Sequence, residues 1–247
     1  MNAVKTNITV RVIAKGGKYL GADIGGAFVT IKNVHTGELL ASGNTQGGSG
    51  PANLMTTTIN RTQSWPTTGA SFFNASLNIG EPVYLKITAT GPNAGLQSIN
   101  EVSATQWIVP GKDITGGDGL LLELPGLLVQ VQSPATHTNL ATINPPVVNF
   151  MANVTMMCGC PITTQPPWVY TDFDVAAIIS VINNDGTKKQ LEILKLNFDK
   201  ITSQFTNHWQ LPGIGFYEAV VYACQPGNGN TGVGKVSFFI PPPAVTQ

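Results

Sequence analysis

The chain is a succession of short segments in which apolar and polar residues alternate, each closed by glycine, proline or asparagine. In Pro82–Thr90, every second residue from Val83 to Ala89 is apolar, and the residues between them are Tyr, Lys and Thr. A strand with one buried and one solvent-facing side has this period of two. No long stretch shows the three-and-four apolar spacing of an amphipathic helix. The pattern predicts an all-β protein built from two-layer sandwiches.

Charge is scarce along the chain. Charged residues make up 11% of the 247 residues, and the formal net charge is zero, whereas an average soluble domain has about 25% charged residues. The hydrophobic fraction of 42% is enough for folded cores. There is no basic stripe for nucleic acid or anionic lipid. Because a neutral, charge-poor surface is weakly protected against association, the composition favours a protein that works in an assembly.

The second half of the chain repeats the plan of the first. The segment that begins at Asn7 (Asn-Ile-Thr) corresponds to the one at Asn153 (Asn-Val-Thr), and the hairpin glycine Gly37 corresponds to Gly186. Gly186 closes an Asn-Asn-Asp-Gly turn, which is a strong hairpin signal. We therefore expect two sandwich domains, residues 1–110 and 147–247, the second with a proline-rich tail. An apolar, β-rich connector at 111–146 would join them.

Two segments carry a family resemblance. Val29–Gly43 reads Val-Thr-Ile-Lys-Asn-Val-His-Thr-Gly-Glu-Leu-Leu-Ala-Ser-Gly and resembles a hairpin of transthyretin-like and carboxypeptidase-regulatory-like sandwiches. Gly215–Cys224 resembles strand F of an immunoglobulin-like domain, with a tyrosine near its start. The resemblance implies a tandem of immunoglobulin-like, Greek-key β-sandwiches. It implies no particular activity, because such folds serve many functions.

Three cysteines are the main candidates for special chemistry, and we expect one disulfide between Cys224 and either Cys158 or Cys160. A disulfide that closes the long loop between Cys158 or Cys160 and Cys224 would stabilise the fold by roughly 4 kcal/mol. The alternatives are three reduced thiols, a thiolate metal site, or a redox-active Cys-Gly-Cys. A structural metal would need four ligands. None of the three histidines has ligand spacing to the cysteines: His35, His137 and His208.

No common catalytic motif occurs. The chain lacks a nucleophile elbow, a zinc-binding His-Glu-x-x-His, a phosphate-binding glycine loop and a dinucleotide fingerprint. Asp172 and Asp174 flank Phe173, and strand alternation places both carboxylates on a solvated edge rather than in a catalytic pair. We therefore expect no catalytic residue, no metal and no cofactor.

An apolar stretch, Gly119–Gln132, falls between the two repeats and matches nothing in the second one. One interpretation is an extra hairpin that covers the junction between the domains. The other is a strand or apolar patch offered to a neighbouring subunit, because strand addition satisfies backbone groups on both chains. The interface candidates are its apolar residues: Leu120, Leu121, Leu122, Leu124, Leu127, Leu128, Val129 and Val131.

Together these features predict a non-enzymatic structural or adhesive component of a surface, filament or virion assembly. Its partners would be other protein subunits, either copies of itself or members of a larger assembly, with no nucleic acid and no membrane insertion. We expect an extracellular or cell-surface location, with a virion as the alternative. One rival function is a glycan- or ligand-binding module that uses aromatic residues near Trp65, Trp168 and Trp209. The other is a redox or metal accessory protein centred on Cys158 and Cys160.

Overall fold

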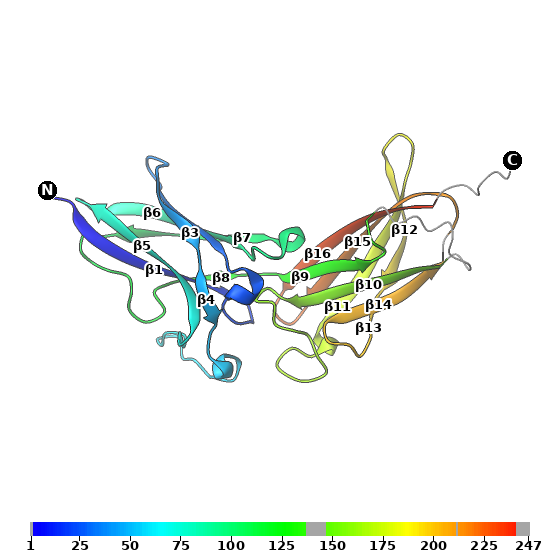
Figure 1. Ribbon diagram of the computed structural model, residues 1–247, viewed down its shortest axis with the longest axis horizontal. Helices are drawn as coiled ribbons and strands as arrows, with labels where there is room; N and C mark the ends of the chain where they lie inside the picture. Colours follow the sequence, from blue (N-terminus) through cyan, green and yellow to red (C-terminus); the bar gives the residue numbers. More distant parts are fainter. Residues whose placement is uncertain (1, 137–146, 211, 241–247) are drawn as a thin grey trace. The chain divides into compact units, whose positions relative to one another are not determined.

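The computed structural model describes residues 2–136, 147–210 and 212–240 (Figure 1). The chain forms two compact units, Met1–Gly126 with Met156–Cys160, and Leu127–Thr155 with Pro161–Gln247. Each unit contains two four-stranded sheets. The prediction of an all-β protein with two immunoglobulin-like β-sandwiches is confirmed. Within the described ranges, no helix is long and apolar enough to cross a bilayer.

The first unit has the sheets β4-β5-β1-β8 and β3-β2-β6-β7. β1 and β8 run parallel, and the other paired strands of the unit run antiparallel. Its elements are β1 (Val4–Ala14), η1 (Ala22–Ile24), β2 (Phe28–Asn33), β3 (Leu39–Asn44), β4 (Gln46–Ser49), η2 (Ala52–Met55), β5 (Ala70–Ile79), β6 (Val83–Gly91), η3 (Leu96–Ser98), β7 (Asn100–Ile108) and β8 (Leu120–Leu124).

The core of this unit follows the alternation seen in the sequence. Ile8 and Val10 of β1 and Leu85 and Ile87 of β6 are fully buried, whereas Lys86, between the latter two, is exposed. A separate cluster involves β1, the loop that follows it, η2 and β5. It consists of Ile13, Tyr19, Leu54 and Ala70, with Leu121 packed against it.

β3 and β4 are separated only by Thr45, where the chain passes from one sheet of the unit to the other. Thr45 is buried, and its Oγ1 accepts a hydrogen bond from the amide of Ala27 at 2.9 Å. The amide of Thr45 donates in turn to the carbonyl of Ala27 at 2.9 Å. These two hydrogen bonds pair the backbone groups of Ala27 and Thr45 at the point where the hydrogen bonds between β2 and β3 end.

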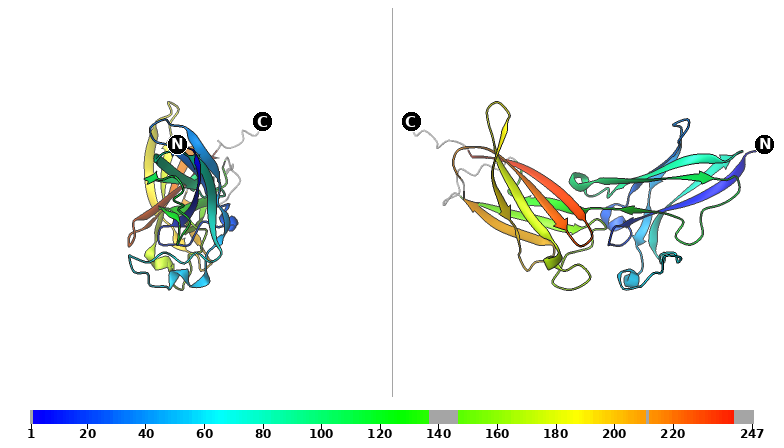
Figure 2. Two further views of the ribbon diagram at one scale, coloured as in Figure 1. Left: turned by 90° about the vertical axis from the view of Figure 1, so that its left-hand side faces the viewer. Right: turned by 180° about the vertical axis from the view of Figure 1, so that it is seen from behind.

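The second unit has the sheets β13-β14-β10-β9 and β12-β11-β15-β16. With β9 as strand A and β12 as the extra strand C′, this is the A-B-E-D and C′-C-F-G arrangement of immunoglobulin-like sandwiches. Figure 2 shows the β11–β12 hairpin extending beyond its neighbouring strands. The elements are β9 (Leu127–Ser133), β10 (Val147–Met156), η4 (Tyr170–Asp172), β11 (Asp174–Ile182), β12 (Lys188–Lys195), β13 (Asn197–Phe198), β14 (Gln204–Gln210), β15 (Gly215–Gln225) and β16 (Asn230–Ile240).

The apolar stretch expected between the domains supplies a strand to each unit, β8 to the first and β9 to the second. Of the eight interface candidates, Leu121 and Val131 are partly buried and the other six are buried. The hydrophobic character of the stretch is therefore largely accounted for by packing in the sandwiches. Residues 137–146 of the expected connector and the proline-rich tail at 241–247 lie outside the described residues.

Candidate functional site

The three cysteines do not form the expected disulfide, because all three are free thiols. Cys158 and Cys160 belong to the first unit, and Cys224 lies near the end of β15 in the second. Cys158 is fully buried, whereas Cys160 and Cys224 are partly exposed. The pairing inferred from the strand positions was therefore wrong in this structure.

Cys158 and Cys160 flank a tight turn. Gly159 has a φ of 76°, and its amide donates to the carbonyl of Met156 at 2.8 Å. The sulfur of Cys158 accepts a hydrogen bond from the amide of Lys18 at 3.4 Å. Burial acts to raise the pKa of Cys158, but hydrogen bonds from the Cys160 thiol and from backbone amides outweigh it and lower the pKa. The pKa of Cys160 is raised, because it hydrogen-bonds to Cys158 and is itself largely buried.

This turn has no metal-site geometry in the part of the chain that the structure describes. No group of three His, Cys, Asp or Glu side chains is placed there to hold an ion. A thiolate metal centre would need further ligands beyond the two cysteines. The redox or metal role of Cys158 and Cys160 stays a prediction.

The tryptophans proposed for glycan binding are mostly inside the protein. Trp168 and Trp209 are buried, and the Trp209 indole Nε1 donates to Glu192 Oε2 at 2.9 Å. Trp65 is exposed. Buried rings cannot stack on a sugar, so this predicted set does not form a binding platform.

A different aromatic cluster is exposed on the first unit, made of His35, Tyr84 and Trp107. Tyr84 and Trp107 are directly opposite on β6 and β7, with ring centroids 5.1 Å apart and planes at 27°. Trp107 is 56% exposed, and His35 lies 6.1 Å from it, centroid to centroid. The outward positions of Tyr84 and Trp107 could have been read from the alternation of their strands, but their pairing required the register.

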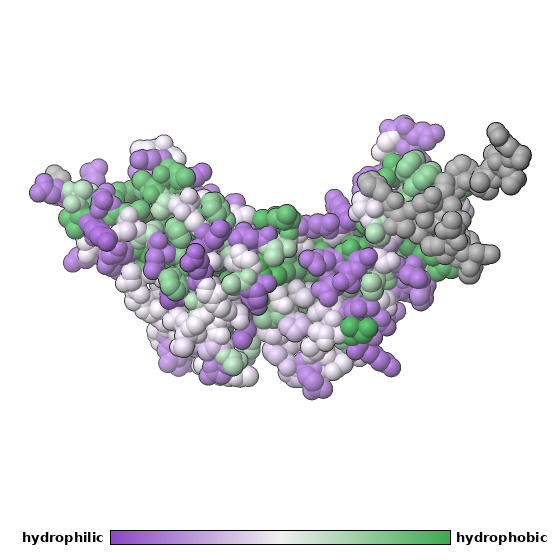
Figure 3. All heavy atoms as spheres, viewed as in Figure 1, coloured by the Kyte–Doolittle hydropathy of each residue, from purple (hydrophilic) through white to green (hydrophobic). Residues whose placement is uncertain are grey.

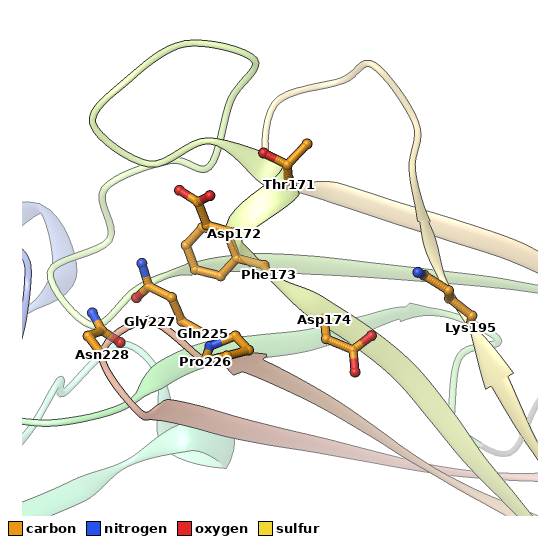
Figure 4. A pocket seen from close by; sticks show the side chains of 9 residues that line it. All are labelled: Thr171, Asp172, Phe173, Asp174, Lys195, Gln225, Pro226, Gly227 and Asn228. Atoms are coloured by element: carbon orange, nitrogen blue, oxygen red, sulfur yellow. The ribbon is translucent and has the colours of Figure 1, made fainter.

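The second unit has a pocket of about 530 Å³ beside the start of β11. Figure 4 shows Phe173 between Asp172 and Asp174, with Lys195 on one side and Gln225 and Asn228 on the other. Both carboxylates are exposed, as the sequence predicted. The pocket offers carboxylate groups from Asp172 and Asp174, the ammonium group of Lys195, and hydroxyl and amide groups. Its lining residues are Thr171, Asp172, Phe173, Asp174, Lys195, Gln225, Pro226, Gly227 and Asn228.

The outer surface of the sheet β12-β11-β15-β16, which borders this pocket, carries a group of apolar side chains interspersed with polar ones such as Ser180, Lys195 and Glu218. The pairing places Ile193, Ile178 and Val220 side by side across three strands. At one end of the sheet, Phe216 and Phe239 stack with centroids 4.4 Å apart. We call the following outward residues the apolar face: Ala176, Ile178, Ile182, Ile193, Phe216, Val220, Tyr222, Val233 and Phe239.

Several of these side chains are strongly exposed. Ile193 is 54% exposed, Phe216 57% and Val233 40%. Figure 3, which views the molecule from the side of β10 and β14, shows that the tip of the β11–β12 hairpin is hydrophilic. The charged residues on the same surface include Lys188 and Glu218, which form an ion pair at 2.7 Å, and Lys235. Large exposed apolar patches on soluble proteins mark interaction sites.

The opposite outer surface of the same sandwich is polar. On the sheet β13-β14-β10-β9, Asn149 faces His208, and His208 Nδ1 lies 2.7 Å from Asn149 Oδ1. Met151 is opposite Thr206, and Asn153 is opposite Gln204. The two outer surfaces of this sandwich therefore differ, because one is polar and the other carries large exposed apolar side chains among its polar ones.

Comparisons with known proteins identify no family, since no protein-family model and no curated protein matches the chain. Among solved structures, fibronectin(III)-like modules of Clostridium thermocellum CbhA align with a TM-score of 0.31 and 9% sequence identity. That alignment covers 99% of this chain and 97% of the other. The C-terminal domain of the Streptococcus agalactiae AgI/II polypeptide BspA aligns with a TM-score of 0.18 and 11% identity, over 95% and 99% of the two chains.

Proposed function

We propose that this protein is a non-enzymatic structural or adhesive component that works through contacts with other protein subunits. The observation that carries the proposal is the apolar face of the second unit. Apart from Asp174 and Ser180, β11 is apolar on both sides, and a strand of that kind is normally covered by protein on both sides. A two-layer sandwich covers only one side. A protein partner on the other side would complete the burial.

The proposal also covers the location of the protein and the family to which its first unit is related. A surface, filament or virion assembly suits a charge-poor chain of tandem sandwiches, and an extracellular or cell-surface site is the setting we propose, with a virion as the alternative. The hairpin β2–β3 carries the transthyretin-like sequence pattern at Val29–Gly43, and we propose that relationship for the first unit alone.

The mass of the purified chain in solution tests this function. Light scattering over a concentration series should show species heavier than the 26.0 kDa of one chain, and electron microscopy should show their shape. A mass of one chain at every concentration, together with no binding to any co-purifying subunit, would contradict the proposal.

A second candidate function is glycan binding, and the cluster of His35, Tyr84 and Trp107 favours it. An exposed tryptophan beside a tyrosine supplies apolar area with polar edges. The Tyr84 hydroxyl donates to Thr105 Oγ1 at 2.8 Å, which fixes the ring on the strand. A glycan array followed by tryptophan fluorescence titration tests this role. Trp107→Ala should abolish a genuine signal, and Trp65→Ala should leave it unchanged.

A further inference from the structure

We propose that the outer surface of the sheet β3-β2-β6-β7 binds an acidic oligosaccharide. The sugar rings would stack on Trp107 and Tyr84, and carboxylate groups on the rings would pair with Lys32 and Lys86. This inference rests on the proposed glycan-binding function, since it names the class of glycan and the residues that select it.

Two lysines lie side by side in the middle of this surface. Lys32 on β2 is directly opposite Lys86 on β6, and both side chains are exposed. β2 and β6 are the two central strands of the sheet. Like charges directly opposite one another on neighbouring strands destabilise a sheet, so the pair costs stability. An anion bound by the two ammonium groups would remove that repulsion.

No carboxylate in the described part of the chain neutralises the pair. Glu38 lies between β2 and β3, and Glu101 is opposite Thr90 on β6, but neither carboxylate forms an ion pair with a lysine. Thr90 is four residues from Lys86, about 13 Å along the strand, which exceeds the screening length of about 8 Å at physiological salt. The surface therefore offers two uncompensated positive charges to an anionic ligand.

The aromatic cluster of His35, Tyr84 and Trp107 is next to the lysine pair. Tyr84 precedes Lys86 by two residues on the same side of β6, a separation of about 7 Å. Trp107 is opposite Tyr84 and is 56% exposed, so the two rings offer apolar area beside the lysines. A sugar ring stacked on the aromatic pair would therefore have its carboxylate close to the ammonium groups.

Hydroxyl side chains form the row on the other side of the lysines, with one residue from each strand. In order across the sheet, this row consists of Ser42, Thr30, Thr88 and Ser103. Hydroxyl groups both donate and accept hydrogen bonds, and the hydroxyl groups of a sugar need partners of both kinds. The row can therefore bind the part of the saccharide that extends past the lysines.

An acidic peptide suits this surface less well than a saccharide. A peptide that binds as an added strand needs a free sheet edge, whereas β2 and β6, which carry the lysines, have a partner strand on each side. Recognition at the lysines must therefore come from side chains alone. Aromatic, ammonium and hydroxyl side chains match the rings, carboxylates and hydroxyls of an acidic saccharide.

Calorimetric titration of the full chain with an oligogalacturonate and with its fully methyl-esterified form tests the proposal. The two ligands have the same sugar rings and differ in the charge of the carboxyl group. We expect the acid to bind more tightly than the ester. The affinity for the acid should fall as the salt concentration rises, because salt screens exposed charges.

Variants of the lysines identify the groups that select the acid. Lys32→Gln and Lys86→Gln should each lower the affinity for the oligogalacturonate by about two- to fivefold. Neither variant should be less stable than the natural chain in urea, because each removes a like-charge repulsion. Lys5→Gln is the matched control, since Lys5 is exposed on β1 in the other sheet of the same unit, and it should leave the affinity unchanged.

Two outcomes would refute the preference for acidic saccharides and leave glycan binding intact. One is equal binding of the acid and the ester that Trp107→Ala abolishes, and the other is a glycan array on which only neutral saccharides bind. Poly-glutamate that binds as tightly as the oligogalacturonate, with no effect of Trp107→Ala, would show a site for acidic peptides and overturn the proposal. No binding of the oligogalacturonate would also overturn it, and an array without any signal would refute glycan binding as well.

Discussion

Tyr19 buries a phenol hydroxyl that has no hydrogen-bond partner among the described residues. A buried polar group without a partner costs about 1–3 kcal/mol. Tyr19→Phe removes that group and keeps the ring in the cluster with Ile13 and Leu54. We expect the variant to be more stable by about 1 kcal/mol at pH 7 in urea unfolding.

The same residue should make stability depend on alkaline pH. Burial, with a contribution from the Asp118 charge and opposed by Arg11, raises the pKa of Tyr19 from 10.0 to about 12. Between these values the unfolded chain loses the proton and the folded chain keeps it, so stability falls as pH rises. Relative to Tyr19→Phe, the natural protein should lose stability between pH 10 and 12. An identical difference at pH 7 and pH 11 would show that the phenol is not held neutral by the fold.

The thiols should differ in reactivity. The pKa of Cys158 is lowered, but its sulfur is fully buried and cannot be reached by the reagent, whereas the pKa of Cys160 is raised because of its hydrogen bond to Cys158 and its burial. Neither thiol should therefore react readily in the folded protein at pH 8. Iodoacetamide labelling followed by peptide mass spectrometry should modify Cys224 faster than Cys160. In urea all three cysteines should label. A deficit of thiols in urea would reveal a disulfide instead.

At the scale of elements, β9 and β16 approach too closely for side chains. A Cβ at Gly232 would collide with the carbonyl of Leu127, and one at Gly234 would lie 2.7 Å from the carbonyl oxygen of Val129. Gly234→Ala should therefore lower the free energy of unfolding by about 1–3 kcal/mol, as overpacking does elsewhere. Gly227→Ala is the matched control, because nothing lies within 4 Å of its added Cβ. Equal unfolding curves for the two variants would contradict this contact.

The crossing from β3 to β4 depends on one hydroxyl. Thr45→Val keeps the shape but removes the acceptor of the Ala27 amide, which would be left buried and unpaired. We expect a loss of about 1–3 kcal/mol in urea unfolding. Thr30→Val, on the outward side of β2, should change stability far less, and a similar loss there would mean that valine itself is the cause.

At the scale of the whole molecule, association should depend on the apolar face. Ile193 and Ile201 are 54% and 55% exposed, but only Ile193 lies on that face. Ile193→Lys places a charge in the contact, and burying an unpaired charge is costly, so the association constant should fall at least about tenfold, which corresponds to 1.4 kcal/mol. Light scattering over a concentration series measures this association constant. Ile201→Lys should associate like the natural chain, and equal weakening by both would point to a general effect of charge.

The sequence alone determined the class of fold, because alternation in segments such as Pro82–Thr90 needs only a period of two and a buried side. It also located the Asn183–Gly186 turn and the exposed carboxylates around Phe173, since these are local properties. It misjudged the cysteines, whose pairing depends on which strands face one another. The sequence showed that residues 119–132 are rich in hydrophobic side chains, but it did not show that they are divided between β8 and β9.

Only the tertiary structure decided what lies on the surface. Continuous apolar runs in β11 and β15 were visible in the sequence, yet a run alone does not reveal whether its second side is covered. The registers that join Ile193, Ile178 and Val220 into one row link strands far apart in the chain. The same is true of Tyr84 and Trp107. Local pattern fixes which way each side chain points along a strand, while the neighbours that it meets are set by pairing across the sheet.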